Sequence, residues 1–171
     1  MPSADPLSVS AAPNGAGVRV VWAADALRAL AGSEDPAPAW RLDSEPDWEA
    51  VESLRVVSAA FEDGRLLALV AARPVGAAGH DAQQPRGVLI EPDGELVELA
   101  EALLSTQYDS SGSPVRIGLE LYTDPESVPL RVAADRQRPA APTASGRTAI
   151  PMAFRLEGAD GDGLLELVTR G

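Results

Sequence analysis

The sequence contains no cysteine and no lysine, and its 14 basic residues are all arginine. Without cysteine, the chain has no thiol nucleophile, disulfide, iron–sulfur cluster or thiolate zinc site. Without lysine, it has no Schiff-base lysine and no lysine of a phosphate-binding loop. His80 is the single histidine, so a Ser-His-Asp triad would have to use it. No catalytic signature emerges from the residues that remain, and we expect no cofactor.

Acidic side chains outnumber basic ones by 26 to 14, which gives a net charge of −12. Such a surface repels phosphate groups, so we expect neither nucleic acid nor an anionic membrane as a partner. No run of about 18 apolar residues occurs, so we expect no membrane insertion. The opening residues, MPSADPLSVSAAPNG, predict a disordered tail over residues 1–16 and not a signal peptide. The lysine-free composition favours a bacterial protein, with the cytoplasm as its default location.

Residues 17–171 have the length of one domain, and most of their pattern is that of short β-strands. VRVVW at 18–22 predicts a first strand, followed by a helical turn over residues 25–31. The proline-rich and acidic stretch at 32–53 predicts an irregular cover. LRVVSAAF and RLLALVAARP flank Asp63-Gly64 and predict a hairpin that is apolar on both faces. Another layer, a helix or a second subunit must therefore cover it.

The second half of the chain also has the pattern of short strands separated by turns. Residues 95–102 fit either a helix or a strand, and a strand is favoured from about Leu103 onward. VRIGLELYT, PLRVAAD and a last hairpin with the turn GADGDG follow, while RQRPAAPTASGR reads as disordered. We expect an all-β, antiparallel meander with little helix that forms a barrel or half-barrel, with a β-sandwich as the alternative.

The order FEDGRLLALVAARP, LLSTQYDSSGSPVRIGLELY, LRVAADR and GADGDGLLELVTRG resembles one half of the lipocalin-like β-barrel proteins of the carotenoid-hydratase type. The resemblance covers roughly residues 54–171. It implies an apolar cavity for a lipid-like or terpenoid-like molecule. Those proteins usually carry two barrels, so the resemblance implies that a site built between two halves would here be absent or require a dimer. No catalytic acid of that family corresponds to a single position of this chain.

Several polar side chains are candidates for a ligand site. Arg116, Glu120 and Tyr122 share one face of a predicted strand, and Tyr108 lies across the turn. A solvated face with a cross-strand ion pair is the more common outcome for such a strip. The alternative is a polar cluster at a barrel mouth that binds or protonates a ligand.

Other candidates have plainer interpretations. Trp22 and Trp40 are more typical of a core or a barrel plug than of ligand contacts. His80 lies in a predicted loop at 75–86, where a histidine is usually solvated. Asp160 to Gly163 reads DGDG but lacks the remaining ligands of a calcium loop, so a turn is expected. We expect no metal site, although a weak divalent cation site in the acidic run is the alternative; that run comprises Glu34, Asp35, Asp43, Glu45, Asp47 and Glu49.

Three functions fit the sequence. The first is binding of a small hydrophobic ligand in a β-barrel cavity, in a homodimer that covers the doubly apolar hairpin. The second is a hydratase or isomerase that transfers a proton from a buried carboxyl, with Glu120 and Glu166 as the candidates. The third is a structural or interaction role with a filled barrel. Whether the barrel is hollow or packed distinguishes them.

Overall fold

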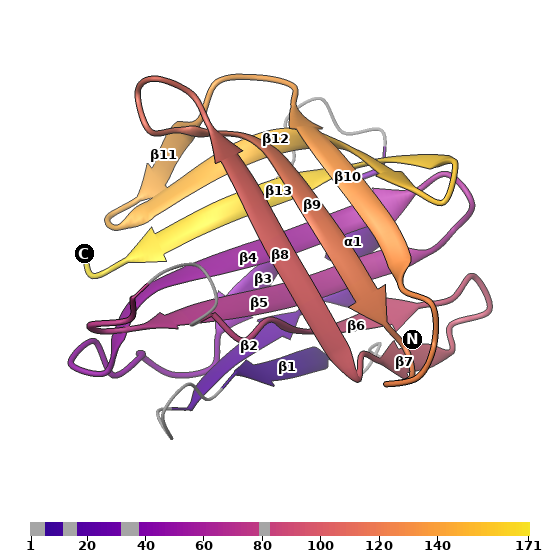
Figure 1. The fold of residues 1–171 in the computed structure, drawn as a ribbon, viewed down its shortest axis with the longest axis horizontal. Helices are drawn as coiled ribbons and strands as arrows, with labels where there is room; N and C mark the ends of the chain where they lie inside the picture. The colour runs from indigo at the N-terminus through magenta and orange to yellow at the C-terminus, as the bar shows by residue number, and fades with distance from the viewer. Residues whose placement is uncertain (1–5, 12–16, 32–37, 79–82) are drawn as a thin grey trace.

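The computed structural model describes residues 6–11, 17–31, 38–78 and 83–171. Over these residues the chain forms thirteen strands and one short helix, α1 (Ala24–Arg28). All of the strand pairings are antiparallel. The predicted all-β class with little helix is therefore confirmed (Figure 1). Over the same residues, no helix reaches the length and hydropathy of a membrane span.

The main sheet consists of two meanders that meet side by side. The first meander contains β4 (Val51–Phe61), β5 (Leu66–Pro74), β6 (Arg86–Ile90) and β7 (Leu96–Glu98). The second contains β8 (Glu101–Tyr108), β9 (Pro114–Tyr122), β10 (Leu130–Arg136), β12 (Arg147–Leu156) and β13 (Ala159–Thr169). β13 pairs with β4 and so joins the two meanders. β7 and β8, consecutive in the chain, become the opposite ends of the strand order.

The sheet curls because its two ends meet at residues 99 and 100. The backbone N–H of Leu99 donates to the carbonyl of Gly87 on β6 (3.0 Å), and that of Ala100 donates to the carbonyl of Tyr122 on β9 (2.7 Å). Adjacent residues are thus bonded to opposite ends of one sheet. β8, β9 and β10 then pass in front of β4 and β5 (Figure 1). The result is the predicted half-barrel. The stretch at 95–102, which the sequence left ambiguous between helix and strand, contains β7 and the first residues of β8 and is therefore strand.

Two apolar cores lie on the two faces of this sheet. The inner core fills the half-barrel with side chains such as Leu69, Ile117 and Met152, each 1% exposed or less. The inward side chains of this core pack against one another, and none of those in the fully buried set exceeds 5% exposure. Close packing of this kind is typical of a protein interior and not of an open lumen.

The outer core lies between the other face of β4, β5, β6 and β13 and an N-terminal cover. The cover is a three-stranded sheet together with α1: β1 (Leu7–Ala11), β2 (Val18–Trp22) and β3 (Trp40–Leu42). Val20, Trp22 and Leu27 from the cover are fully buried against Val56 and Val70 of the hairpin. Both faces of the hairpin of β4 and β5 are thus covered by other parts of the same chain. Its two apolar faces therefore do not require a second subunit.

Two predictions for the first part of the chain are wrong in detail. Residues 1–16 were predicted as a disordered tail, yet Leu7–Ala11 forms β1, which pairs with β2 and buries alternate side chains. The serines of this segment suggested a tail, but Leu7, Val9 and Ala11 alternate with them. This alternation stabilises a strand only when a partner strand pairs with it. The stretch at 32–53 was predicted as irregular, but it contains β3, which pairs with β2.

Two predictions near the C-terminus also need correction. The segment at 136–147 was expected to be disordered, but it contains β11 (Ala141–Ala144), which pairs with the beginning of β12. The last turn is not DGDG: it lies at Glu157 and Gly158, which both have positive φ angles of 50° and 89°. Asp160 to Gly163 belong to β13. Two residues with positive φ angles match the twist of a tight hairpin. The turn between β12 and β13 therefore forms at Glu157 and Gly158, before the DGDG sequence.

Candidate functional site

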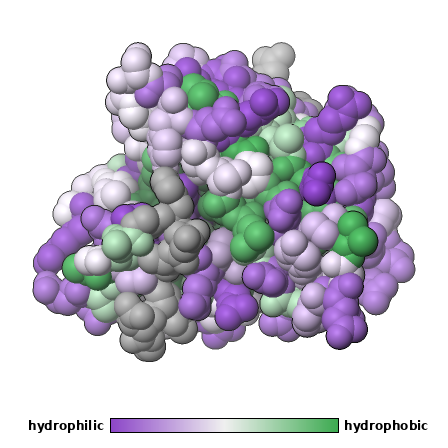
Figure 2. All heavy atoms as spheres, in the orientation of Figure 1, coloured by the Kyte–Doolittle hydropathy of each residue, from purple (hydrophilic) through white to green (hydrophobic). Residues whose placement is uncertain are grey.

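A groove lies on the outer face of the main sheet, over β8, β9 and β10. Its volume is about 790 Å³, within the range of ~300–1,000 Å³ that is usual for small-molecule sites. Apolar surface gathers in a hollow in the middle of this face, with hydrophilic residues around it (Figure 2). The barrel interior is packed, so this groove lies outside the barrel and is not the barrel cavity that the sequence predicted.

Small side chains form the floor of the groove. Ser105, Gly118 and Ala133 are directly opposite one another on the three adjacent strands. They point to the outer face because their neighbours Leu104, Leu119 and Val132 point inward to the inner core. The Ser105 hydroxyl donates to the Gly118 carbonyl at 3.4 Å. A row of three small side chains leaves the backbone uncovered, and this produces the hollow.

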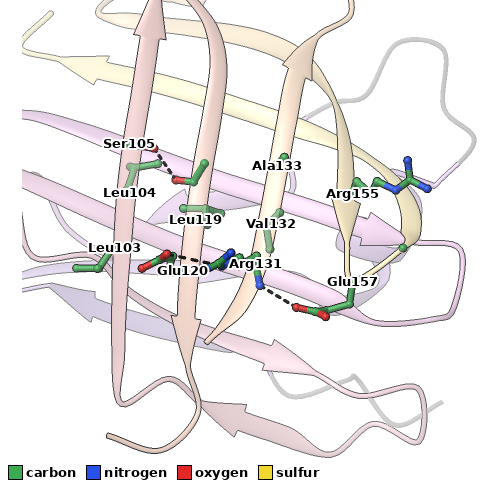
Figure 3. A pocket seen from close by; sticks show the side chains of 12 residues that line it. Leu103, Leu104, Ser105, Leu119, Glu120, Arg131, Val132, Ala133, Arg155 and Glu157 are labelled. Atoms are coloured by element: carbon green, nitrogen blue, oxygen red, sulfur yellow. Dashed lines mark hydrogen bonds and ion pairs between the residues drawn. The ribbon is translucent and has the colours of Figure 1, made fainter. Parts of the chain in front are cut away.

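The next row of the same face supplies one apolar side chain and two opposite charges. Leu103, Glu120 and Arg131 lie opposite one another, and Leu103 is 47% exposed. Glu120 and Arg131 approach to 3.8 Å, and the backbone N–H of Arg131 donates to Glu157 at 3.0 Å (Figure 3). The groove therefore has a floor of small residues, the apolar side chain of Leu103 beside it, and a charged end.

Tyr122 and Glu120 share one strand face as predicted, and the Tyr122 hydroxyl donates to Glu120 at 3.5 Å. Partial desolvation, together with the negative charges of Glu120 and Glu101, raises the pKa of Tyr122. Arg116 lies on the same face but pairs with Asp135 on β10 at 3.0 Å. Arg116 and Tyr122 do not line the groove, whereas Glu120 does.

Tyr108 is part of a separate polar bridge at one end of the half-barrel. Arg55 on β4 donates to the Thr106 hydroxyl at 2.7 Å and to the Tyr108 hydroxyl. Its guanidinium also lies 5.8 Å from the centre of the Tyr108 ring, a cation–π distance. The two residues connect β4 with β8, so the predicted ligand residue Tyr108 is part of this bridge and does not line the groove.

Trp22 and Trp40 lie in the outer core, directly opposite one another on β2 and β3. The Trp22 indole donates to the Ser58 hydroxyl at 2.9 Å, and the Trp40 indole donates to Glu166. Both acceptors are fully buried on the main sheet. The two tryptophans thus attach the N-terminal cover to the sheet, which agrees with the core interpretation.

Glu166, a candidate acid, is fully buried in this interface. Burial raises the pKa of Glu166, which the Trp40 hydrogen bond and the Arg147 charge counteract only in part. Arg147 donates to Glu166 at 3.3 Å and lies 4.0 Å from the centre of the Trp40 ring. The raised pKa suits an acid catalyst, but Glu166 does not line the groove.

Two other sequence predictions concern a divalent cation site in the acidic run and the loop residue His80. Within the part of the chain that is described, no group of three or more His, Asp and Glu side chains could hold a metal ion. Asp43 of the acidic run instead pairs with Arg19 (3.6 Å) and Arg41 (3.7 Å). His80, Glu34 and Asp35 lie outside the described residues.

Sequence reasoning missed the residues that make the groove. Leu103, Ser105, Gly118 and Ala133 were not selected because none of them carries a reactive group. The signal that could have found them is Gly118 in the middle of a strand, since an interior glycine often marks a place where another group approaches closely. Its alignment with Ser105 and Ala133 depends on which strands pair and in which register, and this cannot be seen in the sequence.

Comparisons with known proteins support the fold alone. No protein-family model matches the chain, and no curated protein matches it. The fold is similar to that of a crystal structure assigned provisionally to AttH from Nitrosomonas europaea, with a TM-score of 0.52 and 14% sequence identity. The match covers 75% of this chain and 42% of the other. The chain thus spans about two fifths of the length of that protein.

Proposed function

We propose that the protein binds a small hydrophobic molecule, lipid-like or terpenoid-like, in the groove over β8, β9 and β10. The observation that carries the proposal is the row Ser105, Gly118 and Ala133, which opens a hollow of about 790 Å³. Leu103 beside it is exposed to solvent, and burying it against a ligand would be favourable. The resemblance to barrels of the carotenoid-hydratase type points to the same ligand class.

The charged end of the groove gives the ligand an orientation. Glu120 lies 3.8 Å from the Arg131 guanidinium, and Glu157 accepts the Arg131 backbone N–H, so these three residues gather polar groups at one end of the groove. A ligand with one hydroxyl or carbonyl group would place it here and its apolar body over Gly118. A few placed polar groups in an apolar site usually fix ligand orientation in this way.

The experiment uses the neutral dye Nile red and, as competitor, the terpenoid alcohol geraniol. Two variants fill the groove, Ala133→Leu and Gly118→Val, and both new side chains would project from the outer face of a strand. Ala144→Leu on exposed β11 is the matched control, because it does not line the groove. We expect the two variants to weaken Nile red binding about tenfold or more, equivalent to about 1.4 kcal/mol, and the control to leave it unchanged.

Equal dye binding by all four proteins would overturn the proposal. It would then favour the third function, a structural or interaction role. The same role predicts that Glu120→Gln and Tyr122→Phe change no measured property. A ligand role predicts weaker geraniol competition for Glu120→Gln, since the polar end is disturbed while the fold is retained.

The hydratase or isomerase alternative has no specific observation in its favour. It needs a protonated carboxyl that faces the bound substrate. The carboxyl with a raised pKa, Glu166, is enclosed in the outer core, and Glu120 in the groove is 39% exposed and paired with Arg131. The predicted homodimer stays a prediction, which light scattering on the purified protein would check.

A further inference from the structure

A second cavity lies on another part of the molecule, between β1 of the cover and the hairpin of β6 and β7. Its volume is about 640 Å³, and we call it the β1 cavity. It shares no lining residue with the groove over β8, β9 and β10. Its walls contain both apolar side chains and arginines, so it offers a different chemistry from the groove.

The apolar part of the β1 cavity comes from the outer face of the hairpin. Val88 and Ile90 on β6 line it, and Leu96, directly opposite Ile90, stands above them. Leu96 is 51% exposed, although it borders side chains that are at most 6% exposed. An apolar chain lying along this hairpin would cover Leu96 and gain the free energy of its burial.

The polar part contains the side chain of Arg86. Among the residues that the structure describes, this side chain forms no hydrogen bond or ion pair, whereas Arg28 in the same cavity is 3.5 Å from Asp25. Free guanidinium is unexpected in a chain with a net charge of −12, where acidic side chains are abundant. Arginine presents a planar set of donors that matches a carboxylate in two parallel hydrogen bonds.

The serine hydroxyls and one acid complete the polar surroundings. Ser8 and Ser10 of β1 line the cavity, and the Ser8 oxygen already accepts a hydrogen bond from Arg19 at 3.2 Å, so its own proton can be donated to a ligand. Glu98 also lines the cavity but makes no ion pair with Arg86. The negative charge of Glu98 and the net negative charge of the protein disfavour ligands that carry several negative charges.

We propose that the β1 cavity binds a monocarboxylate with an apolar tail, with its carboxylate on Arg86 and its tail over Val88, Ile90 and Leu96. The site is independent of the proposed function, because the groove and the β1 cavity lie in different places and have different polar groups. A medium-chain fatty acid is the simplest molecule of this class. Charge and tail contribute separately, and this makes the proposal testable with three small probes.

The experiment titrates the ¹⁵N-labelled full chain with octanoate, octanol and acetate. Gly87 and Gly94 line the β1 cavity and Gly118 lines the groove, so their amide signals report the two sites separately. We expect octanoate to shift the Gly87 and Gly94 signals with saturation, and acetate and octanol to do so at least tenfold more weakly. A shift of the Gly118 signal should follow a binding curve of its own, because Gly118 reports the groove and not the β1 cavity.

Variants test each half of the site. Arg86→Gln should weaken octanoate binding at least tenfold, and its matched control Arg170→Gln, on an exposed arginine outside the cavity, should leave it unchanged. Leu96→Ala should weaken octanoate binding, while Leu103→Ala in the groove should not. The proposal fails if octanoate causes no saturable shift at Gly87 and Gly94, or if Arg86→Gln binds octanoate as the wild type does. Because both replaced side chains are exposed, neither variant should endanger the fold.

Discussion

The Trp40 indole donates a hydrogen bond to the Glu166 carboxylate, although the two residues lie 126 positions apart in the sequence. Trp40 belongs to β3 of the N-terminal cover, and Glu166 to β13 of the main sheet. Trp22, opposite Trp40, makes the equivalent bond to Ser58 on β4. The two bonds fix how the cover sits on the sheet, because a shifted cover would take one donor from the buried Glu166 carboxylate and one from the buried Ser58 hydroxyl.

Trp40→Phe should destabilise the protein by about 1 to 3 kcal/mol, because it leaves the buried Glu166 without one of its donors. The free energy of unfolding from urea denaturation measures the effect. Trp48→Phe is the matched control: its indole bonds to Glu45 only three residues away, at 2.6 Å and in an exposed position. Equal losses for the two variants would show that the Glu166 bond is not special.

The stability of the protein should depend on pH through Glu166. Its pKa is raised in the folded state, so the folded protein binds this proton more tightly than the unfolded chain. The stabilisation is complete below the ordinary pKa of 4.5 and is lost as pH rises through the folded-state value. Arg147 is the charged side chain that faces the carboxyl. Its attraction lowers this pKa but does not cancel the effect of burial.

Glu166→Gln isolates this effect from that of other carboxyls. The wild type should lose stability relative to Glu166→Gln as the pH rises from about 4 to 8, and thermal unfolding of both proteins across that range measures the difference. A constant difference in stability between the two proteins at every pH would contradict the shifted pKa of Glu166.

Two glycines in strands should respond differently to substitution. A Cβ at Gly163 would lie 2.1 Å from the Ser58 carbonyl oxygen, which belongs to the backbone of β4 and cannot move alone. A Cβ at Gly118 would meet the Ser105 hydroxyl at 2.9 Å, and that side chain can rotate. Gly163→Ala should therefore cost about 1 to 3 kcal/mol or more, and Gly118→Ala much less. Similar melting temperatures for both variants would show that β4 and β13 can separate to accommodate a methyl group.

The Asp109 carboxylate should stay ionised in acid. Hydrogen bonds from the Ser111 side chain and the Ser113 backbone, together with Arg136 at 3.1 Å, lower the pKa of Asp109 well below its usual range. A lowered folded-state pKa stabilises the protein above the ordinary value, and this contribution disappears as pH falls. Asp109→Asn should therefore unfold less steeply below pH of about 4 than the wild type. Identical acid unfolding curves, followed by circular dichroism, would contradict this.

The strands themselves were predictable because their signal is local. Ile117, Leu119 and Leu121 alternate with polar residues, and alternation with period two is a direct consequence of strand geometry. Leu66 to Ala72 are apolar on both faces, which correctly required a cover on each side. β1 escaped prediction because its alternating pattern is only five residues long, and such a short strand is stabilised only by pairing with a partner strand.

The candidate site could not be predicted in the same way, because it depends on which residues of different strands lie opposite one another. Glu120 was found because it shares a strand face with Tyr122, at a spacing that any strand imposes. Gly118 became the floor of a groove only through its alignment with Ser105 and Ala133, and the register of three strands sets that alignment. Trp40 was predicted to be a core residue, but its partner Glu166 could not be named.

The sequence by itself determined the strand class, the two apolar faces of the central hairpin and the exclusion of thiol and lysine chemistry. These follow from residue types and from the period-two geometry of one strand. The tertiary structure alone decided that the interior is packed, that the N-terminal segment covers the outer face, and that Arg86 lines a cavity beside Val88 and Ile90 with no side-chain partner among the described residues. Each of these depends on which strands become neighbours, and that choice is made by burial and pairing summed over the whole chain.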